Sequence, residues 1–484
     1  MKILLIKISS MGDIIDSTAI IRSMHELFPD AQIDMIIDPA YLKLVSNLKI
    51  VNNFFFFDES TYKSLLNFKK NKFLVFANFF KVLKKIHFEI KKVRMTYYDY
   101  VFDLQGIEKS LLFYFLSRGK QKNCKWSLPY KSIYENKHSH AVYALYATVR
   151  KCDQFKSIPF SFPFYQPEVS TEELLDLNSK ANYDFSAINK NDCINENLNK
   201  SNNNKGPGEN LKKTSDNIRY IVDNIRYIVI SPFTRWETKN YPILYYLIIA
   251  VLLANEGYKV FLTGSKGESI KFREQIDVIK NYVFNDFILY DRFYALEILE
   301  NIDKLQSKNN IQDIGKQKET DKQQDIDKQK DIDKQKETNK TCNSNKLEEI
   351  LENFNKLQDK KKIIDLIGMI SIDQLGYLIS KSALFIGGDS LASHLASACN
   401  TANIVIFGPT SPLRVGPLNT QNSIIVRNTT IDCLECYQRK CKLKGIENKK
   451  CMNSLSPYKI FDLALLLLKK QKIQIQHMNE NKNN

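Results

Sequence analysis

The chain alternates short apolar runs with amphipathic stretches along most of its length, and this alternation restricts its fold more than any other sequence feature. In the first half, apolar runs lie at 3–8, 33–37, 53–57 and 100–104, and helix-type stretches lie at 14–27, 39–47, 74–93 and 107–118. The second half repeats the pattern, with apolar runs at 227–231, 259–263, 363–365, 384–387 and 403–407. Such runs are typical of parallel strands covered by helices on both faces. We therefore predict an α/β fold with two doubly wound domains that face each other across a cleft, with ligands beyond the carboxyl ends of the strands.

The length of 484 residues also favours two domains plus additional segments. Two segments of low complexity interrupt the pattern: 188–217 is rich in Asn and Lys, and 302–347 contains three near-copies of one charged hexapeptide. A six-residue period fits neither an α-helix nor a coiled coil, so we expect a disordered insertion or a frayed charged helix there. We predict a first domain at 1–180 and a linker at 181–223. A second domain with this insertion follows at 224–462, and a C-terminal tail at 463–484.

The formal net charge of +16, from 70 Lys and Arg against 54 Asp and Glu, predicts an anionic partner such as nucleic acid, phosphate or an acidic membrane surface. About half of the excess lies in residues 63–99, where ten basic side chains stand against two acids. Phenylalanines between these lysines favour an anionic amphiphile, with a merely solvated face as the alternative. We expect no nucleic acid partner, because the sequence has no recognisable nucleic-acid-binding motif.

No targeting or membrane-spanning segment is apparent in the sequence. The N-terminal MKILLIKISS has only a four-residue apolar run before Lys7, and the longest apolar stretch, 243–254, is well short of the roughly 20 residues that a spanning helix needs. We therefore expect a cytoplasmic protein with no transmembrane segment. Nine cysteines without a signal do not predict a disulfide framework.

Four of the cysteines are grouped near the C-terminus, at Cys433, Cys436, Cys441 and Cys451. Such a group fits either a tetrahedral zinc site or a set of free or oxidisable thiols, and we assign it no catalytic role.

Small and polar residues follow three of the predicted strands. The first strand runs into Ser10, Gly12 and Asp13, where a helix begins, and Asp13 is either a carboxylate at the cleft mouth or a helix N-cap. The strand at 227–231 runs into a loop whose side chains either reach a phosphate or lie in solvent; they are Thr234, Arg235 and Lys239.

The strand at 384–387 opens through Gly-Gly-Asp-Ser into an Ala/Ser-rich helix, which gives the strongest local signal. Free N–H groups and the positive end of the helix dipole make such a helix start an anion site. It contains Asp389 and Ser390, and His394 follows within the first turns. His394 is either a donor to a diphosphate or a structural histidine.

Four segments in this order resemble glycosyltransferase family 9, the ADP-heptose:lipopolysaccharide heptosyltransferases of Gram-negative bacteria; they are KISSMGDIIDSTAIIRSM, YDYVFDLQGIEKSLLFYFLS, TRWETKNYP and GGDSLASHLASACNTANIVIFGPTSP. The resemblance implies the GT-B fold, in which the first of two Rossmann-like domains binds the acceptor and the second binds the nucleotide sugar, with no cofactor or metal. It further implies an inverting transfer of heptose from ADP-heptose to the lipopolysaccharide inner core, on Kdo-lipid A or a heptosylated core.

By this resemblance the acceptor is an anionic glycolipid, and the protein is peripheral on the cytoplasmic face of the inner membrane. Two alternatives remain at this stage: a GT-B enzyme that uses another nucleotide sugar, and a degenerate, non-catalytic nucleotide-sugar or lipid-binding protein.

The resemblance also implies roles for individual residues. Asp13 matches the general base that deprotonates the acceptor hydroxyl, and Lys239 matches the lysine that offsets charge on the departing ADP. The predicted donor-binding residues are Thr234, Arg235, Lys239, Glu268, Asp389, Ser390 and His394. The predicted acceptor-binding residues are Ser10 and Gly12, together with Lys69, Lys70 and Lys72, which are predicted from the basic stretch at 63–99. One departure from the motif is Leu391, which replaces a glycine and either crowds the phosphate or faces the core.

Overall fold

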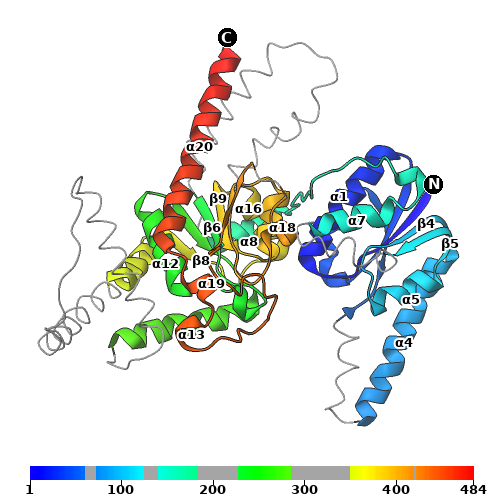
Figure 1. Cartoon of the computed structure of the whole chain (residues 1–484), viewed down its shortest axis with the longest axis horizontal. Helices are drawn as coiled ribbons and strands as arrows, with labels where there is room; N and C mark the ends of the chain where they lie inside the picture. The colour runs from blue at the N-terminus through cyan, green and yellow to red at the C-terminus, as the bar shows by residue number, and fades with distance from the viewer. Residues whose placement is uncertain (60–71, 125–139, 182–226, 285–348, 419–420, 484) are drawn as a thin grey trace, which may run out of the picture.

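The computed structural model describes residues 1–59, 72–124, 140–181, 227–284, 349–418 and 421–483. These residues form two lobes, each built around one parallel sheet (Figure 1). Apart from Ala181, the predicted linker lies outside the described residues, as do the predicted insertion at 302–347, Lys69 and Lys70.

The first lobe contains a five-stranded sheet in the order β3-β2-β1-β4-β5. Its strands are β1 (Lys2–Ile6), β2 (Gln32–Ile37), β3 (Val51–Phe56), β4 (Tyr97–Asp103) and β5 (Arg118–Cys124), and all of them pair in parallel. In β1, every residue after Lys2 is buried, because helices cover both faces of the sheet. The strand order reverses direction between β1 and β4, which is where ligands bind in doubly wound sheets.

The helices of the first lobe alternate with its strands. They are α1 (Met11–Leu27), α2 (Lys43–Ser46), α4 (Lys72–Met95), α5 (Glu108–Leu116) and α7 (Ala141–Val149). Helix α1 follows β1 directly and packs its apolar side against α7 and the sheet, with Ile14, Ile15 and Ile20 fully buried. Helix α4 extends away from the lobe in Figure 1.

The second lobe contains a six-stranded parallel sheet in the order β11-β10-β9-β6-β7-β8. Its strands are β6 (Tyr227–Ser231), β7 (Lys259–Leu262), β8 (Ile363–Asp365), β9 (Leu384–Gly388), β10 (Asn403–Ile406) and β11 (Ser423–Val426). Counted from β6, this is the strand order of a dinucleotide-binding Rossmann fold, and its switch point lies between β6 and β9.

The main helices of the second lobe are α12 (Ile243–Asn255), α13 (Lys266–Phe284), α16 (Ile372–Ser380), α17 (Leu391–Ala398), α18 (Pro412–Val415) and α20 (Pro457–Asn483). Helix α12 is apolar on almost every side because it lies between the sheet and α20. Helix α20 continues through residue 463, where the sequence places the start of a tail, because Leu467 and Leu468 are buried in the core of this lobe.

The two lobes are joined by a segment that crosses from one to the other. Its backbone meets the second lobe where the Tyr165 amide donates to the Ala398 carbonyl at 3.3 Å. After the crossing, α8 (Thr171–Ala181) packs against α16, and Figure 1 shows α8 within the second lobe.

The predicted α/β architecture of two Rossmann-like domains is confirmed, and the central strands lie where the apolar runs indicate. Two edge strands, β5 and β11, were not predicted. The sequence of β5, RGKQKNC, contains no apolar run because one side of an edge strand faces solvent.

Candidate active site

The carboxyl ends of β1, β6, β7 and β9 carry most of the predicted site residues, and contact between the lobes brings Asp13 and His394 together. Helix α1 of the first lobe packs against α17 of the second. They approach closely at Gly12, where an added Cβ would lie 2.8 Å from Cδ2 and 2.9 Å from Nε2 of His394. The turn that holds Asp13 and the helix that holds His394 are therefore in direct contact.

Asp13 lies in the first turn of α1, three residues after the N-cap Ser10. Its Oδ2 accepts hydrogen bonds from the backbone amide and the hydroxyl of Ser10, both at 3.2 Å. The ammonium of Lys7 lies 3.5 Å from the same oxygen, and its side chain is only 3% exposed, whereas that of Asp13 is 45% exposed. Asp13 is thus not the N-cap, and it presents a carboxylate to solvent beside a buried cation.

The loop after β6 is held by its own polar groups. The Thr234 amide donates to Oδ1 of Asn240 at 2.8 Å, and the Thr234 hydroxyl donates to the Trp236 carbonyl at 2.9 Å. Thr234 is buried against Gly388, whose added Cβ would lie 2.8 Å from the threonine methyl group. Its hydroxyl therefore fixes the loop in this structure, and contact with a donor phosphate stays a prediction.

Arg235 is exposed and lies near Tyr41 of the other lobe. Burial and the carboxylates of Asp38 and Glu59 raise the pKa of the Tyr41 phenol, and the Arg235 guanidinium opposes that rise. Arg235 thus brings positive charge close to the first lobe.

Lys239 and Asp389 form an ion pair in the second lobe, with Nζ 2.6 Å from Oδ2. The same carboxylate oxygen accepts a hydrogen bond from the Thr410 hydroxyl at 2.7 Å. The Lys239 ammonium also lies 4.5 Å from the ring centre of Trp236. Because an ammonium has three donors, Lys239 retains the capacity to contact a phosphate while Asp389 fixes its position.

The start of α17 fits an anion. The hydroxyl of Ser390, the N-cap of α17, is buried and has no hydrogen-bond partner within the part of the chain that the structure describes. A buried hydroxyl without a partner at the positive end of a helix dipole is suited to a phosphate oxygen. Leu391 is partly buried and packs against the hydrophobic core, which agrees with the core-facing alternative for this position.

His394 lies one turn into α17, and its side chain is 14% exposed. Burial alone would lower its pKa, but the carboxylates of Asp16, Asp389 and Asp13 outweigh burial and raise the pKa to about 9. Nδ1 lies 3.4 Å from Oδ1 of Asp16. His394 is therefore an imidazolium at neutral pH.

Glu268 caps the start of α13. Its Oε2 accepts a hydrogen bond from the Ser265 amide at 2.6 Å, and the same oxygen lies 3.1 Å from the position of a Cβ added to Gly264. This carboxylate follows β7, the neighbour of β6 in the sheet. Its contact with a ribose stays a prediction.

The four grouped cysteines are free thiols. Within the described ranges, no group of three or more His, Cys, Asp and Glu residues is arranged to hold a metal ion. Burial, together with the three neighbouring cysteines, raises the pKa of Cys451 to about 11. The loop that carries them adjoins the loop after β6, since the Thr238 hydroxyl donates to the Gln438 carbonyl at 2.6 Å and the Arg439 guanidinium lies 5.4 Å from the Trp236 ring centre.

Of the predicted basic acceptor residues, only Lys72 lies in a described element, as the first residue of α4. Among the described helices, none is long and apolar enough to cross a membrane.

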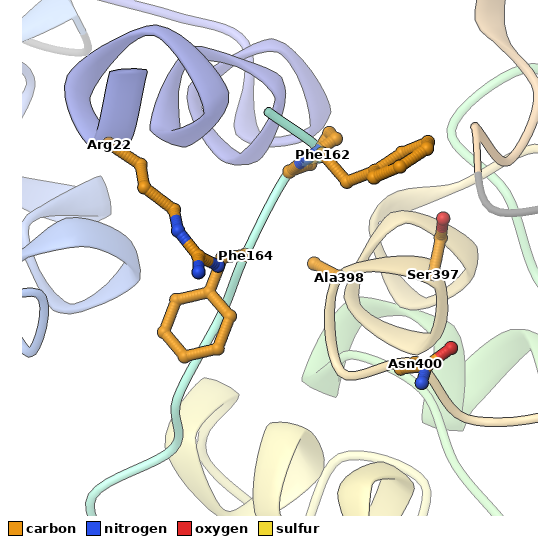
Figure 2. Close-up of a pocket in the computed structure, with 7 residues that line it drawn as sticks. Arg22, Phe162, Phe164, Ser397, Ala398 and Asn400 are labelled. Atoms are coloured by element: carbon orange, nitrogen blue, oxygen red, sulfur yellow. The ribbon is translucent and has the colours of Figure 1, made fainter. Parts of the chain in front are cut away.

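A cavity of about 190 Å³ lies near the carboxyl ends of α1 and α17. Figure 2 shows the residues that line it. The Arg22 guanidinium lies 5.4 Å from the ring centre of Phe164 on its wall. The remaining lining residues are Phe162, Pro163, Ser397, Ala398 and Asn400. This cavity lies between the lobes but apart from Asp13 and His394, and we assign it no role in binding a substrate.

Lys7 and Asp16 belong to the site although neither was predicted. The available signal was their position: Lys7 interrupts the first apolar run, and Asp16 is a single acid in the stretch IIDSTAII, one turn after Asp13. An acid within an apolar helix face indicates a buried partner.

Known proteins resemble this chain in sequence and in fold. Residues 87–283 and 329–447, more than half of the chain, match the family described as glycosyltransferase family 9 (heptosyltransferase). These ranges contain all of the predicted donor-binding residues, whereas Ser10, Gly12 and Asp13 precede them. Lipooligosaccharide heptosyltransferase 2 from Campylobacter jejuni serotype O:2 is 33% identical over 108 residues, which are 22% of this chain and 33% of the relative. The serotype O:6 enzyme is 32% identical over 101 residues, 21% of this chain and 31% of the relative, so each match spans about a third of the relative.

Solved structures with a similar fold cover nearly all of the chain. E. coli ADP-heptose lipopolysaccharide heptosyltransferase II has 16% identity and a TM-score of 0.54, and the match covers 98% of this chain and 100% of that one. E. coli heptosyltransferase WaaC with ADP has 14% identity and a TM-score of 0.52, with 96% and 100% covered. At these identities the likeness concerns the fold, which is GT-B.

Proposed function

Because the chain belongs to glycosyltransferase family 9, we propose that it is an enzyme that transfers heptose from ADP-heptose to the inner core of lipopolysaccharide, with inversion at the anomeric carbon. The observation that carries this proposal is the contact of Gly12 with His394, which brings a carboxylate and an anion-binding helix together. Group transfer from a nucleotide sugar needs both: a base for the acceptor and positive charge for the diphosphate.

Each reacting group has a counterpart in this site. Asp13 accepts the proton of the acceptor hydroxyl as that oxygen attacks the anomeric carbon. Lys7 and the Ser10 donors favour the ionised carboxylate that this step requires. The bond to ADP breaks with its electrons on the diphosphate. The ammonium of Lys239, the imidazolium of His394 and the N–H groups that begin α17 stabilise this charge.

The name of the donor rests on the family and on the names of the relatives. Those relatives are heptosyltransferases, and the second lobe supplies cationic and helix-end groups suited to a diphosphate. These groups are suited to contact the diphosphate and not the sugar. The identity of the sugar is therefore tested below by comparing nucleotide sugars.

The proposed acceptor is an anionic glycolipid, Kdo-lipid A or its heptosylated form, at the cytoplasmic face of the inner membrane. A basic-aromatic patch on the first lobe supports this proposal. It consists of exposed apolar residues beside cations: Phe88, Met95, Tyr97, Phe115 and Leu116, with Lys92 and Arg118. Lys92 Nζ lies 4.4 Å from the Phe88 ring centre, and the Arg118 guanidinium lies 5.9 Å from that of Tyr97.

Part of this patch lies at the start of β4 and β5, where Tyr97 pairs with Arg118. The reacting groups lie at the opposite, carboxyl ends of the strands. The patch therefore serves to hold the first lobe against anionic lipid, and it does not contact the reacting sugar.

The test is transfer by the purified full-length chain. ADP release is followed with ADP-heptose and either Kdo-lipid A or its heptosylated form, and also with other nucleotide sugars. NMR of the product gives the anomeric configuration. We expect the wild type to release ADP from ADP-heptose and Asp13→Ala to release none. The same change at the exposed Asp30 should leave ADP release intact. ADP release no greater than in Asp13→Ala, in a protein that still binds ADP, would exclude the enzyme function. Retention of the anomeric configuration in the product would exclude the proposed transfer with inversion.

A further inference from the structure

Asp16 is the buried acid of the contact between the lobes. It lies one helical turn after Asp13 on α1, and its side chain is 8% exposed, against 45% for Asp13. Its Oδ1 lies 3.4 Å from Nδ1 of His394 in the other lobe. A buried carboxylate is costly unless it has a charged partner, and His394 is that partner here.

The other titratable groups around His394 come from three elements. Asp13 lies on α1 with Asp16, Asp389 lies just before α17, and His140 lies at the start of α7. Asp389 also forms an ion pair with Lys239, so its negative charge is divided between Lys239 and His394.

His140 is held as the neutral form. Its Nδ1 accepts from the Val142 amide at 3.2 Å, so the proton is on Nε2, which donates to the Gly416 carbonyl at 2.9 Å. Burial lowers the pKa of His140, and the charge of His394 lowers it further. The cluster therefore holds one charged histidine, and Asp16 is its nearest carboxylate.

The ring of His394 has a defined orientation. Nδ1 faces Asp16, while the edge formed by Cδ2 and Nε2 lies against Gly12, next to Asp13. The contact with Asp16 thus turns the second nitrogen toward the turn where acceptor and donor would meet.

We propose that Asp16 is a positioning residue that keeps His394 charged and directs its Nε2 to the diphosphate of the donor. The role of His394 at a diphosphate rests on the proposed function, whereas the pairing of Asp16 with His394 does not. Because Asp16 and Asp13 lie on one helix, this pairing also sets the place of the base relative to the donor.

The variant Asp16→Asn tests the proposal, because it keeps the shape of the side chain and removes its charge. In the full chain labelled with ¹³C-histidine, the His394 signal is assigned with His394→Gln among the six histidines. We expect a pKa of about 9 in the wild type and a clearly lower one in Asp16→Asn. The KM for ADP-heptose should rise roughly tenfold at pH 8 and much less at pH 6, where the variant histidine regains its proton.

Asp16→Glu restores the charge and should recover most of the affinity, and Asp30→Asn is a matched change at an exposed acid. A wild-type His394 that titrates near the ordinary histidine value would overturn the proposal without any variant. A KM effect equal at pH 6 and pH 8 would mean that Asp16 acts only in packing. If the protein transfers no heptose, the NMR titration and calorimetric ADP binding still decide the role of Asp16. Failure of the proposed function can therefore be told apart from failure of the Asp16 proposal.

Discussion

The contact between Gly12 and His394 predicts a strong effect from one added methyl group. In Gly12→Ala the new Cβ would lie 2.8 Å from Cδ2 of the ring, whereas carbon atoms are in favourable contact at about 3.5 to 4.0 Å. The ring must retreat by roughly 0.7 Å or more, and Asp16 opposes this movement because it holds Nδ1.

Overpacking of a closely packed contact costs about 1 to 3 kcal/mol. If that cost falls on the complex with donor, kcat/KM for ADP-heptose falls roughly 5- to 150-fold. The helix itself does not account for a loss, because alanine is a better helix former than glycine by up to about 1 kcal/mol.

The assay is steady-state kcat/KM for ADP-heptose, with circular dichroism to verify folding. Gly267→Ala is the matched control, since a Cβ added there meets nothing within 4 Å. Unchanged kcat/KM in Gly12→Ala would refute the reasoning, because it would mean that the lobes do not hold this contact during catalysis.

Three further predictions follow from the same contacts. Lys239→Ala removes the cation of the buried pair with Asp389; we expect ADP affinity to fall about 10- to 150-fold by calorimetry, the range for a hydrogen bond to a charged group. The pKa of His394, raised to about 9, contributes about 3 kcal/mol of stability below pH 6.5 that is lost as the pH rises through 9; urea unfolding at pH 6 and pH 9.5 should show this loss in the wild type and not in His394→Gln. Phe115→Asp, at a site 70% exposed, should weaken co-sedimentation with phosphatidylglycerol vesicles and leave ADP binding unchanged; equal binding by both proteins would remove the patch from the membrane contact.

The central strands could be predicted because burial on both faces leaves a visible apolar run, as in β1 and β6. The edge strand β5 could not, because its exposed positions carry Lys, Arg and Gln. The extent of α20 was missed for a related reason: its last described buried residues, Leu467 and Leu468, stand beside a charged, polar sequence that resembles a tail.

The placement of candidate site residues could be predicted where polar residues follow a strand, as at Asp13, Lys239 and Asp389, and their roles stay predictions. For Asp16 and Lys7 the sequence offers only a weak signal from their positions, because their contacts are set by tertiary packing. The partner of Asp16 is 378 residues further along the chain, and only the approach of α17 to α1 gives this acid a buried cation. The sequence equally could not reveal that the Ser390 hydroxyl is buried without a partner.

The position of α8 means that the second lobe is not one continuous stretch of chain. Leu174 and Leu177 of α8 share a core with Leu378 of α16, and the side chain of Gln374 donates to the Glu173 carbonyl at 2.7 Å. A fragment that begins at β6 would leave this apolar face of α16 in water. Separating the two halves of the protein therefore requires a cut before α8, or a circular permutation that returns α8 to the half on which it folds.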